Sequence, residues 1–338
     1  MNIEMYIFQN RMHNILKGLL NIVFLILFLG DFSLIAQNEI SDYKVCFAVG
    51  DFNSKNILVI RKFENSGQQF YLGVDPDSLE TLIIPSEQIS VKPLSWQQVL
   101  IDYENTAYIK AIQAADKQSF SLQNSGITHG FPKAKGVTLT IDLCPSKKPL
   151  DRIIFTSLIA EFKKSEKPVP IAISITGRFM LTHSKDLIWL RGLIDSNEIS
   201  VTWINHTYNH HYNPKVPLKR NFLLEPNTDL NFEILGTEIA LLQHGFLPSV
   251  FFRFPGLVSD TSIVDSVLQY GLIPIGSDAW LAKGQKVHAG SIVLIHGNGN
   301  DPVGIKDFIK LLQTEKSSVM KNEWLLYDLR ESVEDEFH

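Results

Sequence analysis

Two histidines, His206 and His210, stand four residues apart in the sequence. On a helical turn this spacing places both imidazoles on one face, where both can reach one divalent cation. A catalytic metal site keeps one position open for water, lowers the pKa of that water and polarises the carbonyl under attack. Taken alone, the two histidines also have a structural interpretation, but together with the acid–base residues below they predict a metal centre for hydrolysis, with zinc as the expected ion.

Acid–base partners for this centre stand elsewhere in the chain. Asp142 beside the metal can act as general base, and His296 on the opposite wall can protonate a leaving amine. We expect Arg253 and Asp278 to pair, with Arg253 holding Asp142 and Asp278 orienting it or tuning a catalytic pKa. Each residue also has a structural interpretation: Asp142 as a helix cap, Arg253 with Asp278 as a buried ion pair, and His296 as a core histidine.

These residues lie at or just after the ends of strand-like segments that alternate with helical ones from residue 132 onward. Such alternation predicts an α/β fold with a parallel sheet, whose functional loops gather at the carboxyl ends of the strands. About 200 residues are few for an eight-fold barrel, so we expect an irregular (β/α) barrel over 132–338. The expected strands are 137–141, 169–174, 199–204, 250–253, 272–275, 292–295 and 324–327.

Residues 37–131 differ in pattern and predict a β-rich accessory region followed by a helix. Strand-like runs at 43–49, 56–61, 69–74 and 81–85 are separated by polar turns, and 95–117 has helical spacing. The Gly- and Pro-punctuated stretch 123–132 is the expected boundary.

The first 36 residues resemble a secretory signal peptide, with basic residues before a short apolar run at 19–29. An uncleaved signal anchor remains an alternative, and it would be the protein's contact with a membrane. We therefore expect an exported protein that is periplasmic, at the cell surface or secreted.

Composition narrows the class of protein further. A chain of 338 residues has room for two domains, and 45% hydrophobic residues supply a large core. A net charge of -5, without a dense Lys/Arg run, argues against nucleic-acid binding. The two cysteines, Cys46 and Cys144, could form one disulfide or remain as free thiols.

Five short segments, in order along the chain, resemble the motifs of the polysaccharide deacetylase (NodB-homology) family. They are Thr140 to Pro145, His206 to His210, Arg253 to Gly256, Asp278 to Trp280 and Leu294 to His296. The resemblance covers roughly residues 136–329. It implies removal of N-acetyl groups from a polysaccharide or a peptidoglycan-like glycan, and a backbone N–H near Gly256 as a donor to the oxyanion.

One position departs from the family pattern. The family's third metal ligand is a second Asp, and Leu143 stands in its place. Asp142, Asp151 or the Cys144 thiolate could supply the missing ligand, or no metal binds; we favour a carboxylate, with Asp151 as the expected ligand, because an exported thiol is easily oxidised.

Tyr208, Trp280 and Asn205 are candidate substrate contacts, although Trp280 could belong to the core and Asn205 could end a strand. Two alternatives to a deacetylase stay open. One is a non-catalytic module that binds a glycan or a protein, and the other is an amidohydrolase acting on a non-sugar amide.

Overall fold

The computed structural model describes residues 39–119, 122–131 and 135–334. Contacts group the chain from Asn38 onward in one compact unit. The expected signal peptide or anchor lies outside the described residues. None of the helices within the described ranges has the length and apolar character needed to cross a membrane.

The N-terminal region forms an antiparallel sheet in the order β4-β3-β2-β1-β5, which confirms its predicted β-rich character. Its hairpins turn where residues adopt positive φ: Asn53 and Ser54 after β1, and Ser66 and Gly67 after β2. Two consecutive positive-φ residues match the right-handed twist of paired strands. The strands are β1 (Ile40–Phe52), β2 (Lys55–Asn65), β3 (Gln68–Val74), β4 (Thr81–Pro85) and β5 (Lys92–Pro93).

Two helices follow where one helical stretch is expected. The α2 helix (Trp96–Asp102) begins with a capping box between Ser95 and Gln98, and α3 (Ala107–Lys117) begins with Thr106 as its cap. The Thr106 side chain accepts from the backbone N–H of Ile109 and starts a new helix. The break at 103–106 therefore divides the predicted helical stretch 95–117.

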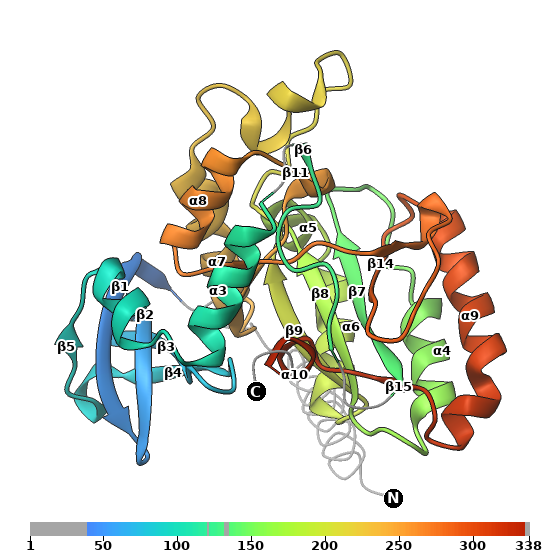
Figure 1. Cartoon of the computed structure of the whole chain (residues 1–338), viewed down its shortest axis with the longest axis horizontal. Helices are drawn as coiled ribbons and strands as arrows, with labels where there is room; N and C mark the ends of the chain where they lie inside the picture. Colours follow the sequence, from blue (N-terminus) through green and yellow to red (C-terminus); the bar gives the residue numbers. More distant parts are fainter. Residues whose placement is uncertain (1–38, 120–121, 132–134, 335–338) are drawn as a thin grey trace, which may run out of the picture. The chain divides into compact units, whose positions relative to one another are not determined.

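The second region is a parallel half-barrel with helices around it (Figure 1), in keeping with the predicted irregular (β/α) barrel. The order is β12-β10-β9-β8-β7-β14-β13, and β15 pairs with the start of β7. Every residue of β7 is buried, as expected for a central strand of a parallel sheet. The strands are β7 (Gly136–Leu143), β8 (Val169–Ile175), β9 (Ile199–Asn205), β10 (Pro248–Phe252), β12 (Ile273–Pro274), β13 (Ala279–Trp280), β14 (Ile292–His296) and β15 (Leu325–Leu326).

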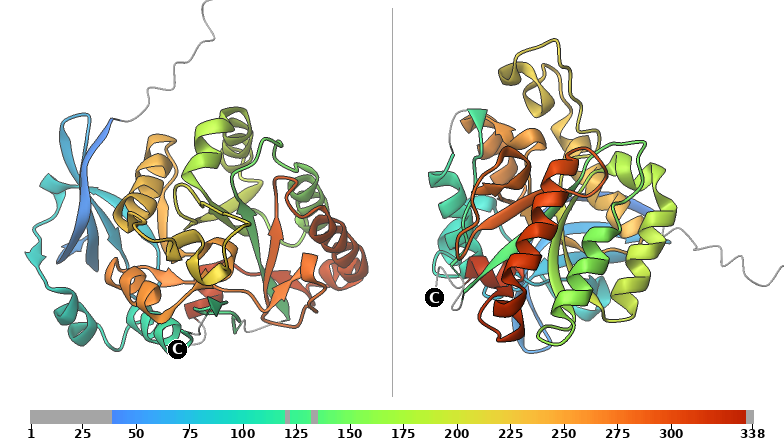
Figure 2. Two further views of the ribbon diagram at one scale, coloured as in Figure 1. Left: turned by 90° about the horizontal axis from the view of Figure 1, so that it is seen from above. Right: turned by 90° about the vertical axis from the view of Figure 1, so that its right-hand side faces the viewer.

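Helices connect these strands, and α4 and α9 pack together beside β14, β7 and β8 (Figures 1 and 2). The helices are α4 (Ile153–Phe162), α5 (Gly177–Thr182), α6 (Ser184–Asp195), α7 (Leu230–Gln243), α8 (Thr261–Gln269), α9 (Pro302–Met320) and α10 (Leu329–Glu334). Shorter elements are the 3-10 turns η1 (Ser86–Gln88), η2 (Leu218–Arg220), η3 (Phe222–Leu224), η4 (Pro255–Leu257) and η5 (Leu281–Lys283), and the strand pair β6 (Leu122–Gln123) with β11 (Val258–Ser259).

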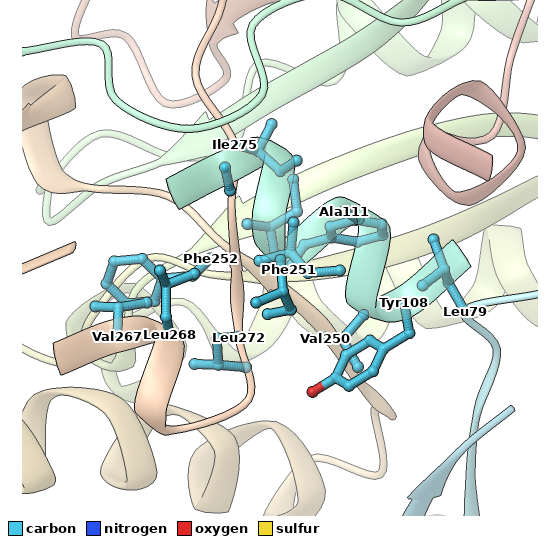
Figure 3. Packing of buried hydrophobic residues seen from close by; sticks show 14 of the residues in the cluster. Leu79, Tyr108, Ala111, Val250, Phe251, Phe252, Val267, Leu268, Leu272 and Ile275 are labelled. Carbon is cyan, nitrogen blue, oxygen red and sulfur yellow. The ribbon is translucent and has the colours of Figure 1, made fainter. Parts of the chain in front are cut away.

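The N-terminal sheet shares a hydrophobic core with the α/β region. One cluster of buried side chains contains Leu58 of β2, Tyr108 of α3, Phe251 of β10 and Val267 of α8. Figure 3 shows Leu79, Tyr108 and Ala111 packed near Val250, Phe251 and Leu272. Burial of this apolar surface stabilises both regions together.

A buried ion pair reinforces this junction. Arg61 of β2 is fully buried, and its Nε and Nη2 donate to the two carboxylate oxygens of Glu238 on α7 at 2.7 and 2.9 Å. The hydroxyl of Tyr43 donates to the same carboxylate at 2.7 Å. All three of these polar side chains thus have a partner, as burial of charge demands.

Candidate functional site

Strand register brings the predicted base and acid together. In the parallel pair β7–β14, Asp142 lies directly opposite His296. Asn205 ends β9, and Arg253 directly follows β10. The polar residues therefore gather at the carboxyl ends of neighbouring parallel strands, as the sequence predicts.

The alternation of β7 decides which side chains face this site. Thr140 and Asp142 point to the same side, because both contact Nη1 of Arg253, at 2.6 and 2.9 Å. Leu143 points the other way and is fully buried in a hydrophobic cluster with Ile141. Leu143 is thus a core residue. Because successive side chains of a strand point to opposite faces, the side chain of Cys144 points to the site again.

Arg253 fixes Asp142 in its ionised form. Arg253 is fully buried, and Nε and Nη2 donate to the carbonyl oxygens of Ile275 and Gly276. Burial of Asp142 opposes ionisation, but the charges of Arg253, His206 and His296 outweigh it and lower the pKa of its carboxyl to about 2. Asp142 therefore carries a negative charge at neutral pH.

His206 presents one nitrogen to the site. Its Nδ1–H donates to the carbonyl of Arg253 at 2.9 Å, which leaves Nε2 directed at the centre. That Nε2 lies 3.7 Å from Oδ2 of Asp142 and 3.6 Å from Sγ of Cys144. A backbone acceptor on the far nitrogen is the usual way in which a metal-binding imidazole is oriented.

The segment from His206 to His210 is a turn with two left-handed residues, so the expected helical turn is wrong. Thr207 has φ 68° and His210 has φ 48°. The ring centroids of His206 and His210 nevertheless lie 4.8 Å apart. The turn brings the imidazoles together without helical geometry.

Side chains around the turn hold it in this conformation. Asn205 Oδ1 accepts from the Thr207 amide at 3.0 Å, and Asn205 Nδ2 donates to the carbonyl of Ile234 on α7 at 2.9 Å. The amide and side chain of Asn209 both donate to the carboxylate of Glu233, at 2.8 and 2.7 Å. Helix α7 therefore anchors the turn, and the amide of Asn205, a predicted substrate contact, serves that anchoring.

Cys144 joins the histidine pair. Among the described residues, Cys144, His206 and His210 form a group whose possible ligand atoms all lie within 4.8 Å of one another. Burial raises the pKa of the Cys144 thiol, but His210, His206 and His296 together hold it well below its ordinary value. Cys46 and Cys144 are both free, so neither takes part in the disulfide that the sequence left open.

Asp151, the carboxylate expected as the metal ligand, lies elsewhere. Its Oδ2 accepts from the backbone N–H of Gly299 at 2.6 Å, and its own N–H donates to the carbonyl of Gly297 at 2.7 Å. In the same loop, the amide of Asn298 donates to the carbonyl of Cys144. Asp151 thus fastens the loop after β14 to the loop after β7, because these loops leave adjacent parallel strands.

His296 has an acidic partner that the sequence analysis missed. Its Nδ1 lies 2.9 Å from Oδ2 of Asp301, an ion-pair distance without the alignment of a hydrogen bond. Burial lowers the pKa of His296, but Asp301, Cys144 and Asp142 outweigh burial and raise it to about 11. A signal was present in the sequence: an acidic residue directly before Pro302 indicates a helix start, close to a strand end.

Asp278 has partners other than the expected Arg253. Its carboxylate lies 2.7 Å from Nδ1 of His129 and accepts from Ser291 Oγ at 3.3 Å and the Ile292 amide at 3.0 Å. These contacts tie the start of β14 to the segment before β7. The expectation that Arg253 and Asp278 form an ion pair is therefore corrected, since Arg253 is used by Thr140, Asp142 and two carbonyls.

The other predicted substrate contacts are spread around the site. Tyr208 packs its ring over Gly177 and lies 4.7 Å from Phe232, and a side chain at Gly177 would collide with it. Trp280 lies 5.8 Å from His296 by ring centroids, with Lys283 over its indole. Gly256, at φ 60°, faces the Phe222 ring.

A cavity of about 580 Å³ opens beside His210. Its walls include Arg178, Phe222, Phe232, Glu233 and Pro255. Such a volume suits a ligand of one or two rings, and the lining combines apolar surface with a few polar groups as binding sites do.

Comparison with known proteins gives one family match and several structural similarities. Residues 41–109 match the model of the RP012 protein N-terminal domain, which covers the N-terminal sheet and the start of α3. A family 4 carbohydrate esterase from Bacillus anthracis is similar at 18% identity over 65% of this chain and 90% of that chain, with a TM-score of 0.47.

Two further structures are similar at the same level. A family 4 pseudoenzyme from Bacillus anthracis has 17% identity over 63% of this chain and 70% of that one, with a TM-score of 0.42. PdaA of Bacillus subtilis, a family 4 carbohydrate esterase, has 16% identity over 73% and 92%, with a TM-score of 0.44. These similarities are weak, and the chemistry of this chain rests on its own residues.

Proposed function

We propose that the protein is a metal-dependent hydrolase that removes N-acetyl groups from a carbohydrate. The observation that carries this proposal is the pairing of Asp142 with His296 at one strand end, beside the converging imidazoles of His206 and His210. The two members of the pair are held in opposite protonation states, which an acid–base mechanism requires.

Asp142 is the base in this proposal. Arg253 takes one of its oxygens, Oδ1, and the other, Oδ2, faces His206 Nε2. An ionised carboxylate with one oxygen toward the centre can accept the proton of an attacking water. Because Arg253 is fully buried and bound on all sides, it also fixes the direction from which the proton is taken.

His296 is the acid. The carboxylates of Asp301 and Asp142 both favour the protonated ring, which can donate a proton to the nitrogen that leaves as an amine. Asp301 orients the ring from the far side. The side chain is mostly buried, which protects this proton from exchange with bulk water.

The residues present fit a divalent metal. His210 Nε2 is buried and has no hydrogen-bond partner among the described residues, and His210 belongs to the group with Cys144 and His206. A buried unpartnered nitrogen costs free energy that a bound ion would offset. The metal, expected to be zinc, would supply charge that polarises the acyl carbonyl and acidifies water.

The proposed substrate is an N-acetylated glycan, either a polysaccharide or a peptidoglycan-like polymer. The five-motif resemblance suggests this class, and the cavity beside His210 offers aromatic and polar groups of the kind that hold sugar rings. We propose that Tyr208, Trp280, Asn205 and Gly256 line the substrate-binding site or support the residues that do. We also propose that the protein is exported to a location where such glycans occur.

The test is release of acetate from N-acetylglucosamine oligomers by the purified zinc-loaded protein. We expect Asp142→Asn to reduce kcat by 10²- to 10⁴-fold, the usual worth of general base catalysis. Asp195→Asn, at an exposed aspartate on α6, is the matched control and should leave the rate unchanged. Equal rates for Asp142→Asn and the wild type would overturn the assignment of the base.

Leu143 favours a second candidate, a non-catalytic module that binds a glycan. It occupies the position of the family's metal-binding Asp and is turned into the core. Glycan binding without acetate release, from protein with a full equivalent of zinc, would favour this module. Acetate release from N-acetyl amino acids but not from sugars would instead favour the amidohydrolase alternative.

A further inference from the structure

We infer that Cys144 is the third protein ligand and binds the metal as a thiolate, so that the site selects a zinc-like soft cation over hard cations such as Mn²⁺ or Mg²⁺. This inference rests on the proposed metal site and specifies its ligand set. It differs from the carboxylate that the sequence analysis favours.

Distances support a shared ion. Bonds of about 2.3 Å to sulfur and about 2.1 Å to nitrogen, meeting at a tetrahedral angle, place the two ligand atoms about 3.6 Å apart. Sγ of Cys144 lies 3.6 Å from Nε2 of His206. The ligand atoms of Cys144, His206 and His210 all lie within 4.8 Å of one another, so little movement is needed to bind one ion.

The nearby carboxylates have other roles. Arg253 holds Oδ1 of Asp142, whose Oδ2 is the proposed base, and Oδ2 of Asp151 accepts from the Gly299 amide. Leu143 is a core residue on the opposite face of the strand. Cys144, by contrast, has its backbone carbonyl fixed by Asn298 while its side chain faces two imidazoles.

The donor set determines the class of metal. A thiolate with two imidazoles suits zinc, cobalt and other borderline or soft ions, whereas Mn²⁺ and Mg²⁺ prefer oxygen ligands. Three protein ligands also leave a fourth position for water, as catalytic zinc sites do. The substitution of a carboxylate by a thiolate thus changes which metal the site holds without closing it.

Cobalt spectroscopy of the full-length protein tests this ligand directly. Metal-free protein titrated with Co²⁺ should show visible bands of a tetrahedral site together with a near-ultraviolet band from charge transfer between thiolate and cobalt. Cys144→Asp should keep the visible bands and lose the near-ultraviolet band. Cys46→Ser is the matched cysteine control and should keep both, because Cys46 lies on β1.

Competition between metals gives the second readout. We expect Cys144→Asp to shift the ratio of Kd values for Zn²⁺ and Mn²⁺ by at least about tenfold toward Mn²⁺. Absence of the near-ultraviolet band in the wild type, or its persistence in Cys144→Asp, would overturn the inference.

A third measurement needs no variant at Cys144. Alkylation of wild-type protein by iodoacetamide, mapped by mass spectrometry, should modify Cys144 far more slowly with zinc bound than without it, while Cys46 reacts equally in both. Equal labelling of Cys144 in both states would contradict the inference. A cobalt–thiolate band without acetate release would sink the proposed hydrolase and leave the ligand assignment standing, and acetate release without the band would do the reverse.

Discussion

In the part of the chain that the structure describes, two arginines are fully buried, and each holds a carboxylate, but they do so differently. Arg61 donates two N–H groups to both oxygens of Glu238, and Tyr43 adds a third donor. Arg253 donates to only one oxygen of Asp142 and uses its other groups on backbone carbonyls. One pair is closed, and the other leaves an oxygen facing the histidines.

This difference distinguishes an ion pair that only stabilises the fold from one whose carboxylate can also take part in proton transfer. In the bidentate pair both oxygens are already engaged by buried donors, so neither oxygen is left facing a site. A carboxylate held by one oxygen keeps its charge and its position, and its second oxygen remains available. Burial and charge alone would therefore not distinguish the two pairs, but the count of engaged oxygens does.

The largest expected effect comes from breaking the closed pair. Arg61→Met leaves Glu238 buried without its main partner, and we expect a loss of about 3–5 kcal/mol in the free energy of unfolding. Urea denaturation measures this loss. Lys167→Met, which breaks an exposed pair with Glu198, is the control and should cost about 1 kcal/mol or less. A loss below 1 kcal/mol for Arg61→Met would remove the contrast between the two arginines.

A smaller effect is expected at the site around Asp142 and His296, where Asp301→Asn removes the negative charge next to the His296 ring. The ring loses its orienting partner, and we expect kcat for acetate release to fall about 10- to 100-fold, a cost of about 1.4–2.7 kcal/mol. Thermal stability should change little, because Asp301 is partly exposed and its side chain makes no capping hydrogen bond to α9. Asp278→Asn is the matched comparison. A larger fall in kcat for Asp278→Asn than for Asp301→Asn would show that Asp278, and not Asp301, is the main orienting residue.

The smallest expected effect concerns Glu166, a half-buried acid that has no arginine partner among the described residues. Burial raises the pKa of its carboxyl to about 7, against about 4.3 in an unfolded chain. The folded state therefore binds the extra proton between these values, and stability falls as the pH rises through that window until the loss is complete above pH 7. Partial exposure limits the size of the effect.

We expect Glu166→Gln to stabilise the protein by about 1 kcal/mol at pH 8, and this gain should shrink toward zero as the pH falls through 5. Urea denaturation at both pH values measures it. Glu323→Gln, at an exposed glutamate, should alter stability equally at both. A gain that is the same at pH 5 and pH 8 would show that charge at Glu166 is not its source.

The sequence predicts the frame of the fold because strand and helix periodicities are local. Strands β7, β8, β9, β10 and β14 lie within a few residues of their expected bounds. The gathering of Asp142, His206, Arg253 and His296 at one end follows from the parallel arrangement alone. Alternation along β7 also contains the information that Leu143 faces the core and Cys144 the site.

Pairings between distant segments could not be predicted in this way. Asp278 meets His129, which is 149 residues away, through the packing of a loop with no periodic pattern. The left-handed conformations of Thr207 and His210 depend on Asn205 and on Glu233 of α7, so the short-range spacing of the histidines suggested a helix instead. The sequence indicates a helix start at Asp301, directly before Pro302, but the contact of Asp301 with His296 depends on how that helix packs.

Helix α7 links the N-terminal sheet to the turn that carries the two histidines. Its Glu238 is bound by the N-terminal sheet, and its Glu233 and Ile234 hold the turn that carries the two histidines. We therefore do not expect the sheet to fold alone when it is moved to another protein, because Glu238, the partner of its buried arginine, belongs to the α/β region. Exchange of the sheet alone would leave Glu238 without Arg61 and would expose core residues such as Phe251 and Val267.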